Sequence, residues 1–163
     1  MPSFPRIERG FNLAEMTVVA VILAVLAGVA MPLAKIAVQR EKEISLHREL
    51  RSIRSAIDAY KKMADEKKIE AEDGTDGFPK TLDVLVKGVK VKEDKADASG
   101  KGGERIVKFL RRIPKDPLTP SGEWGFLSSQ DAPDSNTWDR KNVYDVYSKS
   151  RAAALDGTKY RDW

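Results

Sequence analysis

Residues 9–32 read RGFNLAEMTVVAVILAVLAGVAMP, and the apolar run inside them decides the fold. The uncharged stretch extends from Met16 to Ala34, 19 residues bounded by Glu15 and Lys35. A helix of that length spans roughly 28 Å at about 1.5 Å per residue, close to the ~30 Å core of a lipid bilayer. A buried core helix is the alternative, but a domain of this size rarely holds a helix that is apolar on every side. The sequence therefore predicts a membrane-spanning helix.

The composition of the remaining chain is that of an ordinary folded protein. The 163 residues include 33% charged and 41% hydrophobic residues, which suits one domain with an appendage. The net charge of +4 comes from intermixed signs, so we expect no nucleic-acid partner. The chain has no cysteine, which excludes disulfides, cysteine-ligated zinc, thiol nucleophiles and iron–sulfur clusters. His47 is the single histidine, so sites that need two imidazoles are also excluded.

The residues before the apolar run allow two kinds of membrane segment. A secretory signal peptide has a positive start, here Arg6 and Arg9, and a small-residue cleavage site, here after Ala30. That interpretation leaves Glu15 unexplained. An acidic residue at the entrance of an apolar helix costs about 2–3 kcal/mol to insert into a membrane unless it is paired, so it indicates a function.

The segment ERGFNLAEMTVVAVILAVLAGVAMP resembles the class III signal of type IV pilins and type II secretion pseudopilins. In that family a membrane-embedded prepilin peptidase cleaves after the glycine, which corresponds to Gly10, and methylates the new amino-terminal residue, Phe11. The family's glutamate at the fifth mature position corresponds to Glu15, and its proline at the end of the run to Pro32. The resemblance therefore implies that this chain is a substrate of prepilin peptidase.

The resemblance also implies roles for the two residues inside the membrane segment. Glu15 of one subunit would neutralise the α-amino group of Phe11 on its neighbour, since two ions that are costly alone in hydrocarbon are tolerable as a pair. Alternatively, Glu15 is only a first-turn acid that is favoured by the helix dipole. Pro32 removes one helical hydrogen bond and predicts a kink or a locally melted stretch.

The charges around the run conflict with the topology of the family. More basic residues follow the run than precede it, namely Lys35, Arg40, Lys42 and Arg48 against Arg6 and Arg9. The positive-inside rule would place the C-terminal side in the cytoplasm. The resemblance implies the opposite, a single-pass protein of the inner membrane with its C-terminal head in the periplasm, and we adopt that topology.

A second helical pattern follows the apolar run. Apolar residues recur at alternating spacings of four and three, at Leu46, Leu50, Ile53, Ile57, Tyr60 and Ala64. This is one face of an amphipathic helix, and nothing between Lys35 and Gly74 is Gly or Pro. We therefore expect one helix from about residue 11 to 68, roughly 85 Å long, its second half packed on a head. A coiled-coil dimer is the alternative. We expect His47 to be a partly exposed helix residue rather than a catalytic base.

The chain after the long helix predicts short elements. Gly74 and Pro79 mark a turn, and Thr81 is a typical cap for a short helix that ends near Lys87. Residues 90–104 read KVKEDKADASGKGGE, which predicts an exposed mobile loop.

Two short strands are expected further along, at 124–127 and 143–148, with a polar loop between them. Together with the resemblance these elements imply an α+β, pilin-like fold, in which a long N-terminal amphipathic and transmembrane helix packs on a small antiparallel β-sheet head. The expected divisions are a leader at 1–10, the transmembrane half of the helix at 11–35 and the periplasmic head at 36–163.

The C-terminal region carries the second resemblance. RRIPKDP and the tail SKSRAAALDGTKYRDW are similar to segments of the major pseudopilin of type II secretion, the G-type subunit. Many such subunits bind calcium in this loop, which implies Asp156 and Asp162 as candidate ligands, although the adjacent Asp pair of the family is missing. The alternative is that Asp156 and Gly157 make a turn and Asp162 is solvated. We expect Tyr160 and Trp163 to pack on the head.

The function implied is structural. The chain would be a subunit of a periplasmic pseudopilus that pushes exoproteins through the outer membrane. Its partners would be prepilin peptidase, further copies of itself in a helical filament, minor pseudopilins, an inner-membrane platform protein, an assembly ATPase and the membrane. We expect no catalytic residues, no enzyme activity and no required cofactor, with calcium as the one possible ligand.

Other functions remain open at this point. Within the same superfamily, a type IV pilin for adhesion, motility or DNA uptake is the alternative, although such pilins commonly close their C-terminal region with a disulfide that this chain cannot form. A membrane-anchored binding module that never polymerises would predict no cleavage after Gly10 and indifference to substitution of Glu15. A membrane-anchored hydrolase would need a nucleophile with its base, and no motif such as G-x-S-x-G occurs.

Overall fold

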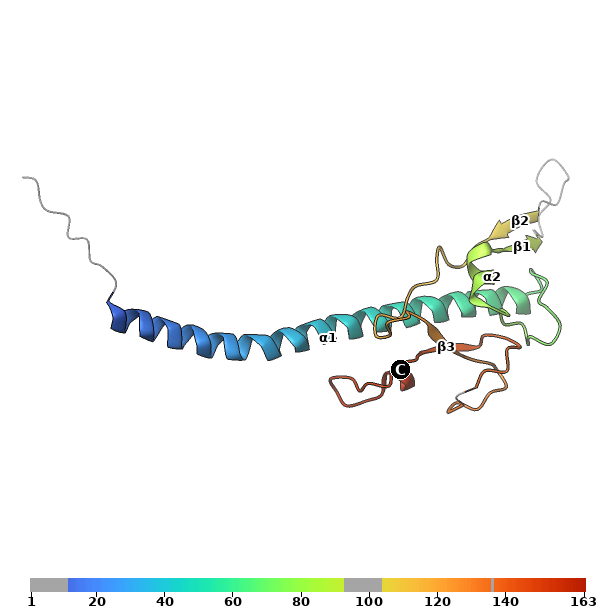
Figure 1. Cartoon of the computed structure of the whole chain (residues 1–163). Coiled ribbons are helices and arrows are strands. Elements are labelled where there is room, and N and C mark those ends of the chain that lie inside the picture. Colours follow the sequence, from blue (N-terminus) through green and yellow to red (C-terminus); the bar gives the residue numbers. More distant parts are fainter. Residues whose placement is uncertain (1–11, 93–103, 136) are drawn as a thin grey trace, which may run out of the picture. The chain divides into compact units, whose positions relative to one another are not determined.

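The computed structural model describes residues 12–92, 104–135 and 137–163 (Figure 1). The chain divides into two compact units, Met1–Arg40 and Glu41–Trp163, and the second is called the head below. The described residues of the chain form helices and short antiparallel strands, so the fold class is α+β. The long N-terminal helix that the sequence predicts is present as α1, Leu13–Asp65.

The first unit contains the apolar part of α1, residues 13–40, called the apolar segment below. The backbone N–H of Ala14 donates to Oδ1 of Asn12 at 3.4 Å, and the N–H of Met16 to the carbonyl oxygen of Asn12 at 3.1 Å. These bonds satisfy amides that a helix start otherwise leaves without partners. The most apolar 18-residue window of α1 has a mean hydropathy of 2.5 and no buried residue. This helix, near the N-terminus, is long and apolar enough to span a membrane.

The second half of α1 belongs to the head and buries one stripe of side chains, as predicted. Five of the six predicted stripe residues are between 0% and 4% exposed, whereas the sixth, Ala64, is half-buried. Ala56, 5% exposed, joins the stripe, whose buried residues are Leu46, Leu50, Ile53, Ala56, Ile57 and Tyr60. The helix ends at Asp65, three residues before the predicted end, because Lys67 takes a left-handed conformation with φ of 55°. The amide of Lys68 then donates to the carbonyl oxygen of Met63 at 3.0 Å, which completes the C-terminal cap.

The short helix α2, Leu82–Lys87, begins directly after Thr81, as predicted. Thr81 makes no side-chain cap hydrogen bond, and instead its carbonyl oxygen accepts from the amide of Val84 at 3.3 Å. Gly88 follows the helix with φ of 87°, and a Cβ there would lie 2.7 Å from the carbonyl oxygen of Val107. The chain therefore needs glycine at this turn.

The prediction of a loop at 90–104 is wrong at both ends. The structure has β1, Val89–Lys92, paired antiparallel with β2, Glu104–Val107. Val91 is only 6% exposed and joins the core, so the valines alternate with lysines as a half-buried strand requires. The charged composition of this stretch conceals that alternation. Residues 93–103 lie outside the described part of the chain.

The two predicted strands at 124–127 and 143–148 are confirmed, the second beginning at Asp145. β3, Trp124–Leu127, pairs antiparallel with β4, Asp145–Ser148, in a register that opposes Trp124 to Ser148. The described residues therefore form two separate two-stranded sheets, and the expected small sheet is divided. Both sheets contribute to the core that covers the stripe of α1, through Val91 in β1 and through Trp124 and Val146 in β3 and β4.

The predicted polar loop between β3 and β4 is held by a buried asparagine. The Nδ2 of Asn142 donates to the carbonyl oxygen of Thr75 at 3.0 Å, and its Oδ1 accepts from the amide of Ser129 at 3.0 Å. The indole N–H of Trp138 donates to the carbonyl oxygen of Asn142 at 2.6 Å, and its ring lies 5.0 Å from that of Phe126. These contacts tie the loop to the strands and to the turn after α1.

Candidate functional site

The candidate processing and assembly residues lie at the start of the chain. Gly10 and Phe11 fall outside the described residues. Glu15 lies in the first turn of α1 and is exposed. An acid in this position is favoured by the unsatisfied amides and the dipole of the helix N-terminus. It is the only charged residue among positions 12–34, so any partner in an apolar environment must come from outside this stretch.

The helix is continuous at Pro32, and the melted stretch that the proline predicts is not present. Proline lacks the N–H that would donate to the carbonyl oxygen of Gly28, so one hydrogen bond is lost. The hydrogen-bonded turns on both sides maintain the helix, since one missing bond is a small fraction of a 53-residue helix.

The side chains of the apolar segment form an uncovered apolar surface. Large residues are 53–68% exposed, among them Ile22, Leu23, Leu26, Met31 and Leu33. Soluble monomeric proteins rarely expose contiguous apolar surface of this extent, which marks a membrane or protein contact. By length and composition the segment could therefore span a membrane.

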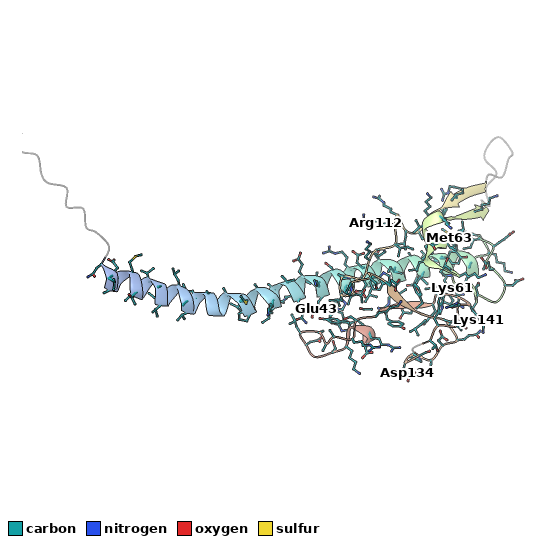
Figure 2. The ribbon with its side chains drawn as sticks, in the orientation of Figure 1. Glu43, Lys61, Met63, Arg112, Asp134 and Lys141 are labelled. Carbon is teal, nitrogen blue, oxygen red and sulfur yellow. The ribbon has the colours of Figure 1, made fainter. Side chains whose placement is uncertain are left out.

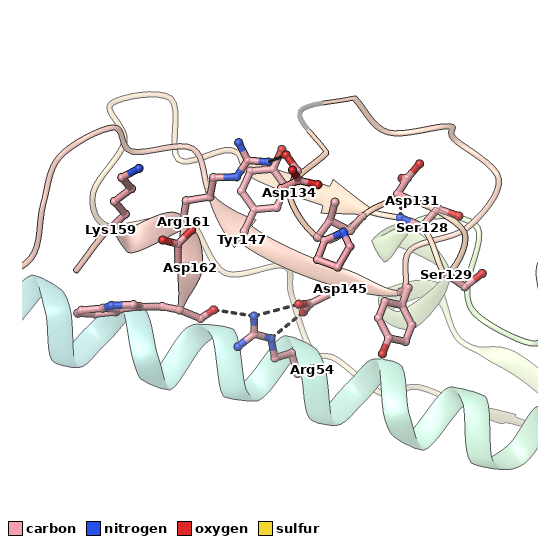
Figure 3. Close-up of a pocket in the computed structure, with 14 residues that line it drawn as sticks. Arg54, Ser128, Ser129, Asp131, Asp134, Asp145, Tyr147, Lys159, Arg161 and Asp162 are labelled. Carbon is pink, nitrogen blue, oxygen red and sulfur yellow. Dashed lines mark hydrogen bonds and ion pairs between the residues drawn. The ribbon is translucent and has the colours of Figure 1, made fainter.

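A second candidate region is an open groove of about 820 Å³ on the head (Figure 3). Arg54 of α1 lies at its base and pairs with both carboxylate oxygens of Asp145 at the start of β4, at 2.7 and 3.1 Å. The same guanidinium donates to the carbonyl oxygens of Val146 at 3.2 Å and Trp163 at 2.7 Å. Arg54 therefore joins α1, β4 and the C-terminal segment.

The other arginine of the groove is also engaged with the protein. Arg161 donates to the carbonyl oxygen of Asp134 at 3.2 Å, and its guanidinium lies 4.8 Å from the centroid of the Tyr147 ring. This cation–π contact holds the C-terminal turn that carries Arg161 against Tyr147 of β4. Within the described residues the two arginines of the groove thus position loops.

The Asp of the PKDP segment is buried beneath β4. Asp116 is 2% exposed; its Oδ2 accepts from the hydroxyl of Ser148 at 2.7 Å and its Oδ1 from the amide of Leu118 at 2.8 Å. The indole of Trp124 donates to the carbonyl oxygen of Pro114 at 2.8 Å. Partners at this distance offset the cost of burying the carboxyl. The segment that carries the G-type resemblance is therefore an internal brace of the head.

The C-terminal aromatic residues pack on the head, as predicted. Tyr160 is 1% exposed, and its hydroxyl donates to Oε1 of Glu43 at 2.7 Å. Glu43 lies on α1 (Figure 2). The indole of Trp163 stacks on His47 with centroids 4.1 Å apart and planes 7° apart, and it meets Tyr160 edge-on at 5.0 Å. His47 is exposed at the helix surface, as predicted.

The two calcium candidates are placed differently. Asp156 forms a turn with Gly157 (φ 86°), in which its Oδ1 accepts from the amide and hydroxyl of Thr158 at 2.9 and 2.6 Å. These two bonds, hydroxyl first, hold the pKa of Asp156 below its ordinary value. Asp162 is exposed at the rim of the groove in Figure 3. In the part of the chain that the structure describes, no three His, Cys, Asp or Glu side chains are grouped to hold a metal.

Sequence reasoning missed the residues that fasten the head together. Arg54 and Glu43 border the apolar stripe of α1, a position from which a charged side chain can reach over the packed loops. Their partners lie 91 to 117 residues away in sequence, so no local pattern identifies them. The signal for Asp116 was its place in a rigid segment between two prolines, Pro114 and Pro117.

Comparisons of the chain with protein-family models, with curated proteins and with solved structures returned no match. The resemblance to pseudopilins therefore rests on the sequence motifs, and the compatible layout of one long apolar helix and two small antiparallel sheets is a separate observation.

Proposed function

We propose that this chain is a structural subunit of a periplasmic pseudopilus of a type II secretion system. It would enter the inner membrane as a prepilin, lose residues 1–10 to prepilin peptidase and receive a methyl group on the amine of Phe11. The observation that carries the proposal is the apolar segment, which has one acid at its start and no other charge to Ala34. Among the residues that the structure describes, none in its most apolar window is buried.

The physical argument concerns what covers this segment before and after assembly. Lipid covers it in the membrane, and the same segments of other copies would cover it in a filament. Glu15 would favour the filament over the lipid, because its carboxylate is costly in hydrocarbon until it pairs with a cation. Cleavage after Gly10 creates such a cation at Phe11, and pairing between neighbours would set their register.

The head supports the proposal by being a folded unit of its own. Its core lies between the stripe of α1 and the two sheets, and the residues of this core belong to the head. Heads of this kind would form the outside of the polymer. Minor pseudopilins would contribute to the filament, and a platform protein and an ATPase would add subunits at its base. A type IV pilus remains the alternative assembly.

Mass spectrometry of the mature N-terminus tests the proposal. The full-length chain is isolated from membranes of its native cell, and a Gly10→Val variant serves as the uncleavable control. We expect the wild-type chain to begin with N-methylated Phe11 and the variant to keep its leader. A chain that begins at Met31 would indicate signal-peptide removal, and an intact N-terminus a simple anchor. Either result would contradict the proposal.

A further inference from the structure

The C-terminal segment, residues 149–163, is fastened to α1 by contacts with three of its side chains. Glu43 accepts from the Tyr160 hydroxyl at 2.7 Å and from the amide of Leu155 at 2.9 Å through the same oxygen. One helical turn along, His47 stacks on Trp163. Two turns further, Arg54 donates to the carbonyl oxygen of Trp163 at 2.7 Å. Three side chains spaced along one helix thus hold the segment at Leu155, Tyr160 and Trp163.

The segment also closes on itself. Two backbone hydrogen bonds hold its turn. The amide of Ala154 donates to the carbonyl oxygen of Thr158 at 2.8 Å, and the amide of Gly157 donates to the carbonyl oxygen of Ala154 at 2.9 Å. The indole N–H of Trp163 donates to the hydroxyl of Thr158 at 2.7 Å. Because Ala153 bridges to Lys159, the segment folds as a small loop whose closed end faces α1 through Leu155.

Three of the oxygen atoms near the segment accept hydrogen bonds from the protein itself. Calcium takes six to eight oxygen ligands, mostly carboxylates and carbonyls. Here Oδ1 of Asp156 accepts two bonds from Thr158, Oε1 of Glu43 accepts two, and the carbonyl oxygen of Trp163 accepts from a guanidinium. The cationic Arg54 occupies the place between segment and helix. Among the described residues no three His, Cys, Asp or Glu side chains are grouped there, so the donor set does not fit a calcium ion.

We propose that residues 149–163 are a metal-independent latch, in which contacts with Glu43, His47 and Arg54 of α1 hold the segment on the helix without a bound cation. The head then keeps its closed C-terminal segment in the absence of calcium. A second consequence rests on the proposed function: if the chain builds a filament, filament assembly does not respond to calcium.

Trypsin reports on the latch directly, because Arg151 and Lys159 are exposed residues within the segment. The full-length chain is purified in detergent and digested in EDTA and in millimolar CaCl2, and the release of each C-terminal peptide is followed by mass spectrometry. We expect equal cleavage rates after Arg151 and Lys159 in both conditions, and a melting temperature that differs by less than about 1 °C. Faster cleavage in EDTA, or a rise of about 4 °C or more with calcium, would overturn the proposal.

Substitutions on α1 test the attribution to named side chains. Glu43→Ala and Arg54→Ala should each speed cleavage after Lys159 several-fold, in EDTA and in calcium alike. Glu43→Gln keeps an oxygen that accepts from Tyr160 and should stay close to wild type. Glu41→Ala and Arg51→Ala are matched controls, since both residues are exposed on the same helix.

Wild-type cleavage rates in both alanine variants would refute the latch. If Arg54→Ala fails to fold, the comparison of Glu43→Ala with Glu43→Gln and the wild-type calcium titration still decide the question. Because the measurements are made on detergent-solubilised protein, they do not depend on filament formation, and failure of the proposed function would leave their outcome unaffected.

Discussion

The two parts of α1 are built from the same helical hydrogen bonds but have opposite surroundings. Residues 13–40 present large apolar side chains that are 44–83% exposed. From Leu46 onward the apolar stripe is at most 5% exposed through Tyr60, and charged residues occupy the opposite face. The difference shows that helix formation and side-chain burial are separate problems. The head buries its apolar stripe in its own core, whereas no residue of the most apolar window of the apolar segment is buried.

The largest expected effect separates the two parts by the same substitution. Ile53 is 0% exposed and Ile22 is 53% exposed. Ile53→Ala should lower the free energy of unfolding of the head by about 3 kcal/mol, because it leaves a cavity in the core. Ile22→Ala should change it by less than about 0.5 kcal/mol. Chemical denaturation of the detergent-solubilised chain, followed by tryptophan fluorescence, measures both values. Equal losses would mean that the apolar segment belongs to the folded core.

The next effect concerns assembly and leaves folding intact. Glu15→Ala should reduce the filament fraction recovered after shearing by roughly 100-fold, since an unpaired amine in hydrocarbon costs about 2–3 kcal/mol. The melting temperature of the head should not move. Glu41→Ala is the control, because Glu41 is an exposed acid on the same helix outside the apolar segment. Normal filament yield from Glu15→Ala would show that this acid is only a favourable first-turn residue.

A glycine pair gives the third effect. A Cβ at Gly125 in β3 would lie 2.2 Å from the ring of Tyr147, its register partner in β4, whereas a Cβ at Gly28 meets nothing within 4 Å. Gly125→Ala should therefore displace the tyrosine and destabilise the head by about 1–3 kcal/mol. Gly28→Ala should leave the head unchanged. Thermal unfolding of both variants, monitored by circular dichroism, distinguishes them.

The smallest effect is a pH dependence of the head. Burial, and secondarily the charge of Glu72, raises the pKa of Tyr60 above its ordinary value near 10. The unfolded chain therefore releases the Tyr60 proton at a lower pH than the folded chain does. The contribution of the protonated Tyr60 hydroxyl to the free energy of unfolding is complete below pH 10 and is lost as the pH rises through the pKa of the folded state. Tyr60→Phe should weaken the fall in unfolding free energy above pH 10, by at most about 1.4 kcal/mol per pH unit. Identical curves would remove Tyr60 as the cause.

The sequence predicted those elements whose signal is local. The spacing of Leu46, Leu50 and Ile53 predicted the buried stripe, and the short apolar runs predicted β3 and β4. The hairpin of β1 and β2 was missed because its lysines dominate the composition, although Val91 is buried. A count of charges over a window does not detect the alternation of apolar and polar residues, with a period of two, that is typical of a half-buried strand.

The contacts of the candidate sites were less predictable for a different reason. Arg54, Glu43 and Asp116 act on residues brought near by the tertiary fold, and their roles depend on which loop covers which turn of α1. The sequence predicted that Tyr160 packs on the head but not that Glu43 receives its hydroxyl. The calcium prediction for Asp156 and Asp162 came from resemblance, and the turn was the alternative interpretation of Asp156.

Cysteine cross-linking of the apolar segment tests the central claim most directly. The chain has no cysteine, so each variant carries a single thiol. Positions from Val18 to Leu26 are substituted one at a time, oxidised in native membranes and in sheared filaments, and compared with the same variants in the uncleavable Gly10→Val background. We predict disulfide-linked dimers at one or more positions in the cleaved chain and none in the uncleaved chain. Monomers at every position of the cleaved chain would contradict the account.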